Sequence, residues 1–198
     1  MYFGRSVCIK GNTVIAGSPG KNNDIGAAYV YVEPTGRWTD MTQTAVLSAS
    51  DGTEGDGFGL SVSVDGRTAV AGAPQMYPGL GAAYVYSEPA SGWVNMQETA
   101  KLTGDRGLDE FGASEIVQGN VVWVGQPYTI SDRRGEVLEY VKPARGGWKS
   151  TSKFSFKLSP GTGNRVHYFG TSVGSTGEAM AIGAPNFLYP GTAYVFGR

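Results

Sequence analysis

Charge, cysteine and histidine are all scarce in this chain of 198 residues, and each scarcity excludes a class of protein. Charged residues make up 17% of the chain and the net charge is −1, so no basic surface favours nucleic acid as a partner. The single cysteine, Cys8, cannot form an intrachain disulfide. No apolar run approaches the roughly 20 residues of a membrane span, so we expect no membrane insertion. The N-terminus shows no basic-then-apolar signal sequence.

Glycine is abundant instead, with 31 residues, about twice its usual share of roughly 7%. Aromatic residues reach 12%, which argues against disorder, because disordered segments are poor in aromatics. This combination is typical of short strands joined by tight turns. The composition therefore predicts an all-β protein.

One sequence frame occurs four times: a Phe-Gly pair opens it and a Gly-x-Pro closes it. The second copy reads FGLSVSVDGRTAVAGAP. In every copy the first glycine of Gly-x-Pro follows the phenylalanine by 14 residues, from Phe3 to Gly17, Phe58 to Gly72, Phe111 to Gly125 and Phe169 to Gly183. A constant offset repeated four times indicates a repeat architecture.

Each repeat contains four strand-like segments. The first two are joined by very short turns that favour primed hairpins: Gly11-Asn12, Asp65-Gly66, Gly119-Asn120 and Thr176-Gly177. The third begins at Gly26, Gly81, Gly135 and Gly191, and the fourth falls in residues 33–47, 88–102 and 142–158. Successive frames start 55, 53 and 58 residues apart. Four antiparallel strands in such a period predict a β-propeller blade.

The chain thus reads as one array, 1–198, with repeats at 3–57, 58–110, 111–168 and, in part, 169–198. The last blade is expected to lack its outer strand. The small residues are expected to let strands crowd near the axis, and each phenylalanine to wedge between blades. Three arrangements stay open: a four-bladed ring, a fragment of a larger propeller, and a half-ring that closes by forming a homo-oligomer.

The Phe-Gly and Gly-Ala-Pro frame resembles FG-GAP repeats, the blades of the integrin α-chain propeller. The second and fourth repeats carry it in full, at Phe58-Gly59 with Gly72-Ala73-Pro74 and at Phe169-Gly170 with Gly183-Ala184-Pro185. The resemblance implies an extracellular or cell-surface recognition or adhesion module. It does not fix a ligand, because one fold serves many functions.

Repeats of the integrin type often hold calcium in an Asp-rich loop between the first two strands. Here that loop has shrunk to a hairpin too short to wrap a cation, so we expect no cofactor. An alternative is a weak calcium site in the linkers before the second and third repeats. Its candidate ligands are Asp51, Asp56, Asp105 and Asp109. The simpler interpretation is that these residues form the turns between blades.

In a propeller, the loops between strands 2 and 3 share a face with the loops between blades, and this face usually binds ligands. Aromatic rings beside Asn and Asp there suit a glycan or a protein side chain. The candidates are Asn23, Asp24, Tyr77, Tyr128, Asp132 and Tyr189. The alternative is that the tyrosines pack on neighbouring blades.

Nothing in the sequence argues for an enzyme. His167 is the only histidine, and no nucleophile-elbow pattern accompanies it. Cys8 lies in an expected inner strand and is interpreted as a buried thiol. Trp38, Trp93 and Trp148 recur at one place in the repeat, which favours a structural role. Two functions remain: a non-catalytic module that binds protein or glycan, and a structural piece that only assembles.

Overall fold

The computed structural model of the protein describes residues 2–74, 80–104, 110–128, 134–161, 168–186 and 190–197, and these residues form sixteen strands. No helix occurs among these residues. The strands are β1 Ser6–Lys10, β2 Thr13–Ser18, β3 Ala27–Val32, β4 Ala45–Ser48, β5 Ser61–Asp65, β6 Thr68–Ala73, β7 Ala82–Ser87, β8 Met96–Gln97, β9 Ala100–Leu102, β10 Ser114–Gln118, β11 Val121–Gln126, β12 Glu136–Val141, β13 Phe156–Leu158, β14 Ser172–Ser175, β15 Ala179–Ala184 and β16 Thr192–Gly197.

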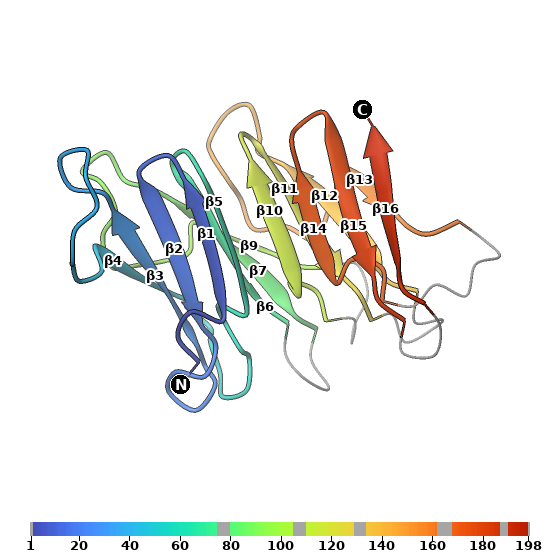
Figure 1. Ribbon diagram of the computed structural model, residues 1–198, viewed down its shortest axis with the longest axis horizontal. Helices are drawn as coiled ribbons and strands as arrows, with labels where there is room; N and C mark the ends of the chain where they lie inside the picture. Colours follow the sequence, from blue (N-terminus) through green and yellow to red (C-terminus); the bar gives the residue numbers. More distant parts are fainter. Residues whose placement is uncertain are drawn as a thin grey trace.

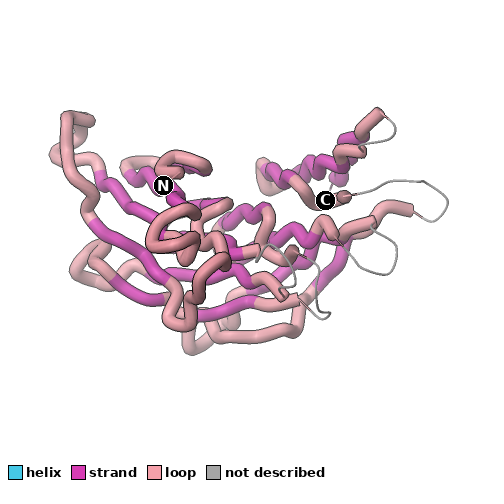
Figure 2. Tube along the Cα trace, turned by 90° about the horizontal axis from the view of Figure 1, so that it is seen from below, coloured by secondary structure: helices cyan, strands magenta, loops and turns pink. Residues whose placement is uncertain are grey.

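Four sheets follow one another along an arc, one for each repeat (Figure 1). Blade 1 is β1–β4, blade 2 is β5, β6, β7 and β9, blade 3 is β10–β13, and blade 4 is β14–β16. Within each blade, successive strands pair antiparallel. The first strands of the blades, β1, β5, β10 and β14, contact one another in that order. Figure 2 shows the N-terminus at the first blade and the C-terminus at the last. The predicted propeller blades, the last with three strands, are confirmed.

The inner hairpins are as short as the sequence predicts, although the turn of blade 4 is Gly177-Glu178 rather than Thr176-Gly177, because the amide of Thr176 donates to the carbonyl of Ala179 (3.0 Å). In blade 1, Lys10 pairs with Thr13, which leaves Gly11 and Asn12 in the turn. Gly11, Gly66 and Gly119 all have positive φ at the first turn position, which a primed turn requires. The second turn is Gly66-Arg67 rather than Asp65-Gly66, because Asp65 still pairs with Thr68.

The glycines of the repeat let neighbouring blades meet backbone to backbone. A Cβ on Gly17 would collide with the carbonyl oxygen of Gly59, the glycine that follows phenylalanine in the next repeat. Gly72 and Gly125 face Gly112 and Gly170 in the same way. Beside each contact a serine hydroxyl of the first strand donates a hydrogen bond to that same carbonyl: Ser6 to Gly59 (2.9 Å), Ser61 to Gly112 (2.8 Å) and Ser114 to Gly170 (2.6 Å).

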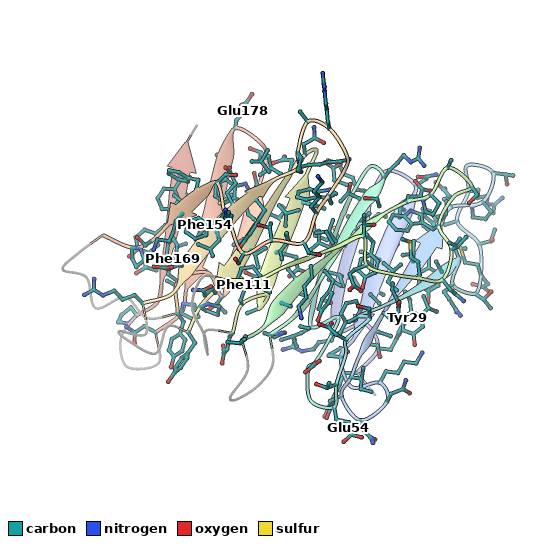
Figure 3. All side chains as sticks on the ribbon, turned by 180° about the vertical axis from the view of Figure 1, so that it is seen from behind. Tyr29, Glu54, Phe111, Phe154, Phe169 and Glu178 are labelled. Atoms are coloured by element: carbon teal, nitrogen blue, oxygen red, sulfur yellow. The ribbon has the colours of Figure 1, made fainter. Side chains whose placement is uncertain are left out.

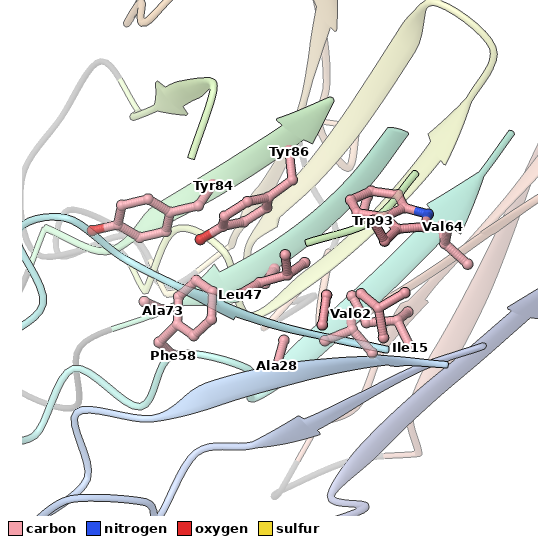
Figure 4. Close-up of a cluster of buried hydrophobic side chains, with 14 of the residues drawn as sticks. Ile15, Ala28, Leu47, Phe58, Val62, Val64, Ala73, Tyr84, Tyr86 and Trp93 are labelled. Atoms are coloured by element: carbon pink, nitrogen blue, oxygen red, sulfur yellow. The ribbon is translucent and has the colours of Figure 1, made fainter. Parts of the chain in front are cut away.

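The hydrophobic core lies between the blades. Phe58, Phe111 and Phe169 are fully buried at successive junctions, as the wedge interpretation predicts, and Figure 3 labels two of them. Between blades 1 and 2, aliphatic side chains such as Ile15 and Leu47 face Val62, Val64 and the rings of blade 2 (Figure 4). A sheet with two apolar faces is stable only if a neighbour covers each face, so the blades stabilise one another.

The short parallel pairing of β8 with β4 was not predicted. After Trp93 the chain of blade 2 crosses to the outer strand of blade 1, where Met96 and Gln97 pair with Leu47 and Ser48. Blade 3 repeats this crossing, because Thr151 bridges to Leu102 in parallel. Blades 2 and 3 therefore each extend the outer edge of the blade before them.

Trp93 and Trp148 are buried in these crossings, which supports the structural interpretation, whereas Trp38 is 38% exposed. Cys8 lies in β1 as expected, but it is only partly buried, with its sulfur 4.0 Å from the carbonyl oxygen of Val64. The interpretation of Cys8 as a buried thiol is therefore wrong in degree, because the side chain is only partly buried.

Candidate ligand-binding face

A depression of about 470 Å³ lies where the β2–β3 loop and the linker from blade 1 to blade 2 meet. These two kinds of loop therefore do share one face of the molecule. Charged and aromatic side chains line this depression. Tyr2 and Arg5 come from the start of blade 1, and Asp24 comes from the β2–β3 loop. Asp56 and Leu60 come from the linker and the start of blade 2. The depression thus combines one cation, two carboxylates and an exposed ring.

The loop that carries Asn23 and Asp24 is held in an unusual backbone conformation. Asn22, Asn23 and Asp24 all have positive φ, which Asn and Asp tolerate better than most residues. The backbone amides of Gly55 and Gly57 donate to the carbonyls of Asn23 (3.3 Å) and Asp24 (2.8 Å). These bonds fix the loop against the linker.

The two predicted residues of this loop have different roles. The side-chain amide of Asn23 donates to Glu54 at 3.0 Å, which ties the loop to the linker. Asp24, in contrast, lines the depression. Asp24 is therefore the residue of this pair that is positioned for a ligand.

A second depression, of about 250 Å³, adjoins the first, and Asp56 lines both. Asp51, Tyr84 and Lys101 supply its polar groups. Asp51 accepts hydrogen bonds from Tyr84 (2.8 Å) and Lys101 (2.6 Å). Burial alone would raise the pKa of Asp51, but these two bonds outweigh it and lower the pKa below its usual value. Asp51 is consequently a fixed anion beside a cation.

The carboxylates suggested as calcium ligands have partners within the protein. Asp56 accepts from the backbone amide (2.7 Å) and hydroxyl (2.9 Å) of Thr53, which is how an aspartate stabilises a turn. Asp51 is bound by Tyr84 and Lys101. In the part of the chain that the structure describes, no three acidic, histidine or cysteine side chains come together as metal ligands. The contacts of Asp56 fit the turn interpretation, whereas those of Asp51 join the linker to blade 2. Asp105 and Asp109 lie outside the described residues.

Of the remaining candidates, only Tyr128 lies among the described residues. Tyr128 stacks on Tyr168, the residue just before the fourth repeat, with ring centroids 6.2 Å apart and planes at 28°. This contact agrees with the alternative in which the tyrosine packs on the next blade. Tyr77, Asp132, Tyr189 and His167 lie outside the described residues.

Sequence reasoning missed Arg5, Tyr84 and Lys101 as members of this face. Arg5 carried a recognisable signal, because the second position after the repeat phenylalanine is otherwise Leu60, Ala113 or Thr171. A charge that replaces an apolar or small residue at one position of a repeat is a candidate for function. Lys101 gave no such signal, because strand positions that face solvent are often lysine.

One further polar group lies away from this face, between blades 2 and 3. Glu115 on β10 is buried, although the same repeat position is Val7, Val62 or Val173 in the other blades. One carboxylate oxygen contacts the hydroxyl of Ser61, and the other has no hydrogen-bond partner among the described residues. Burial raises the pKa of Glu115 to about 8.

Comparison with known proteins gives one clear family match. Residues 1–31 and 41–86 match the family model described as "FG-GAP repeat". No curated protein matches the chain. Among solved structures, the chain is similar to the structure of a neuraminidase-like protein from A/bat/Guatemala/164/2009, with a TM-score of 0.49 and 9% sequence identity. That alignment covers 100% of this chain and 52% of the other, so this chain spans about half its length. A likeness this distant carries no argument about function.

Proposed function

Because this chain carries FG-GAP repeats folded as propeller blades, we propose that it is a non-catalytic recognition module that binds a protein or glycan ligand. The ligand binds the loop face of blades 1 and 2. One observation carries the proposal: two adjoining depressions on that face share Asp56 and present charges of both signs. Pockets of this kind, shaped by rigid strands and lined by a few polar groups, are typical of binding sites.

The chemistry of the face suits ligands with many hydrogen-bonding groups. Asp24 can accept hydrogen bonds from sugar hydroxyls or from a basic side chain, and Arg5 offers a planar fork of donors. The ring of Tyr2 is 67% exposed beside them, so it can stack on a sugar ring or an aliphatic side chain. An extracellular or cell-surface location is part of this proposal. Among the described residues, no helix is long and apolar enough to cross a membrane.

The direct test is binding of the labelled chain to an immobilised panel of glycans and, separately, to cell-surface proteins of known sequence. We expect Arg5→Ala and Asp24→Asn each to weaken binding at least about tenfold, since each removes a charged group from the pocket. Matched controls are Arg37→Ala and Asp40→Asn, which are exposed in the connection after β3, at the opposite end of that strand from the β2–β3 loop. Thermal unfolding should be equal in all four variants. Binding that survives Arg5→Ala and Asp24→Asn would contradict the proposal.

A second candidate function is assembly, in which the chain is a structural piece of a larger ring. It is favoured by the open face of blade 1. Phe3, Val7 and Ile9 are more than half exposed, whereas their counterparts Phe58, Val62 and Val64 are buried against the preceding blade. Exposed apolar surface of this kind is a common mark of an interface.

A further inference from the structure

An apolar groove of about 510 Å³ lies between blades 3 and 4, away from the loop face. Trp123, Phe156 and Leu158 of blade 3 form one wall, and Met180 and Phe196 of blade 4 form the other. Gly177, in the hairpin between β14 and β15, lies at one end. Phe156 is 54% exposed although its ring contacts Trp123 edge to face at 6.5 Å. The groove is therefore open to solvent and lined by large rings.

At the other two junctions the corresponding place is filled by tryptophan. Trp93 is 5% exposed and packs in the cluster that contains Ile15, Val30 and Ala45 of blade 1 (Figure 4). Trp148 is 4% exposed and packs with the equivalent residues of blade 2, which are Val70, Val85 and Ala100. The residues at the same repeat positions in blade 3 are Trp123, Glu139 and Phe156, and all three line the groove. The groove is thus the seat that a tryptophan from the following blade occupies elsewhere.

Two strand edges flank this seat. After Trp93 the chain pairs in parallel with β4, and after Trp148 the backbone of Thr151 exchanges hydrogen bonds with Lys101 (3.0 Å) and Thr103 (3.2 Å). No described strand pairs in this way with the outer edge of β13. The outer edge of β16 is also without a paired strand in the described chain, whereas β3, β7 and β12 each pair there with a fourth strand. Val195 at that edge is 74% exposed.

We propose that this groove and its two edges form a binding site for an extended peptide strand that carries a tryptophan. The peptide follows the pattern of the chain's own blades, in which Ala and Leu come seven and nine residues after Trp, as in Trp38, Ala45 and Leu47 and in Trp93, Ala100 and Leu102. The indole fills the groove, and the following segment adds a fourth strand to blade 4 along β16. The interaction combines strand addition at an open edge with an aromatic anchor in an apolar pocket.

A peptide strand is the occupant that matches the two junctions inside the chain, between blades 1 and 2 and between blades 2 and 3. At both of them the same three elements are covered together: the Trp seat, the outer edge of the preceding blade and the outer edge of the third strand. A small ligand would cover the seat alone and leave the backbone groups of both edges to solvent. A peptide strand covers all three elements. This site is separate from the loop face, so neither proposal depends on the other.

The test uses the whole chain and a labelled peptide with the sequence of residues 92–103, GWVNMQETAKLT. Fluorescence anisotropy should show saturable binding of one peptide per chain, and the complex should unfold at a higher temperature than the chain alone. A peptide with Trp93→Ala should bind at least about tenfold more weakly, because a buried tryptophan anchor commonly dominates such interfaces.

A variant of the groove separates this proposal from nonspecific adsorption. Phe156→Glu places a charge on the groove wall at a largely exposed position, and it should weaken peptide binding at least about tenfold. Val94→Glu is the matched control, since Val94 is 44% exposed and lies outside the groove. Equal binding of both peptides, or equal binding by wild type and Phe156→Glu, would overturn the proposal. Absence of peptide binding together with a dimer that Phe156→Glu dissociates would also overturn it, in favour of a second copy in the groove.

Discussion

Glu115 is the residue at which the repeat departs most from its own pattern. Three blades place valine at this position, which is buried between blades in blade 2, and blade 3 places a carboxyl group there. The Ser61 hydroxyl and a backbone hydrogen bond from Gly72 offset part of the cost of burial, but one oxygen stays without a partner among the described residues. A buried carboxyl with incomplete hydrogen bonding favours its neutral form.

This environment predicts a pH dependence of folding stability. The folded-state pKa of Glu115 is about 8, above the ordinary pKa of 4.5 for a glutamate carboxyl in solvent. Between these values the folded protein keeps a proton that the unfolded chain has released, so stability falls as pH rises. The slope is roughly 1 kcal/mol per pH unit. The stabilisation is fully present below about pH 4.5 and is lost as pH rises through about 8.

Urea unfolding at several pH values across this window measures the effect. Glu115→Gln should flatten the slope, because the amide does not titrate, and Glu115→Val should be more stable than wild type at the upper end of the window. Glu178→Gln, at an exposed hairpin position, is the control and should keep the wild-type slope. An unchanged slope in Glu115→Gln would show that this carboxyl is not the group responsible.

At the scale of the strands, the closing glycine of each of the first three repeats allows two blades to approach each other. The alternative explanation, a left-handed backbone, does not apply to Gly17, Gly72 or Gly125, because none of them has a positive φ. The space for a side chain is instead taken by a carbonyl of the next blade. Gly183 in blade 4 is different, since a Cβ there would meet only the Ser172 side chain.

Two of the four closing glycines, Gly17 and Gly183, therefore provide a matched pair of variants. Gly17→Ala should lower the free energy of unfolding by about 1–3 kcal/mol, because the backbone of Gly59 must move to accommodate the methyl group. Gly183→Ala should cost less than about 1 kcal/mol, since a serine side chain can rotate away. Chemical denaturation of both variants gives the comparison. Equal losses would mean that the glycines are retained for another reason.

Much at this scale could be predicted from the sequence, because the evidence was local. The hairpin at Gly11-Asn12 and the third strands follow from turn chemistry and from a repeated alternation of small and aromatic residues. The pairing of β8 with β4 could not be predicted, since two residues carry no periodic signal and their partner is about fifty residues away. Arg5 could be recognised as an exception within the repeat, whereas the neighbourhood of Asp51 and Lys101 depends on how two blades pack.

At the scale of the whole molecule, blades 1 and 4 lie at the two ends of the arc, and each leaves one sheet face uncovered by another described blade (Figures 1 and 2). Blade 1 exposes Val7 and Ile9, whose counterparts in blade 2 are buried against blade 1. Blade 4 exposes Ala181, Ala193 and Val195 on its far face. The counterparts of these three residues in blade 1 are Ile15, Ala28 and Val30, which are fully buried against blade 2. We therefore expect blade 1 of one copy to pack against blade 4 of another.

This complementarity predicts self-association through a head-to-tail contact. Light scattering after gel filtration should give a mass near twice 20.9 kDa if two copies close into a ring. Ile9→Lys should return the chain to a monomer without loss of folding, because the side chain is 62% exposed in the single chain. Val94→Lys is a control of similar exposure at a site away from both ends. Addition of calcium or of a chelator should leave the mass unchanged.

The distribution of masses also decides between the two functions proposed above. A contact of this type either closes, which gives a fixed mass, or repeats without closing, which gives masses that grow with concentration. A fixed dimer mass or a mass that grows with concentration would support assembly, provided that Ile9→Lys abolishes it. The ligand assays should then be repeated on the assembled form. A monomer at every concentration would contradict assembly and leave recognition at the loop face, where the effects of Arg5→Ala and Asp24→Asn do not depend on the state of association.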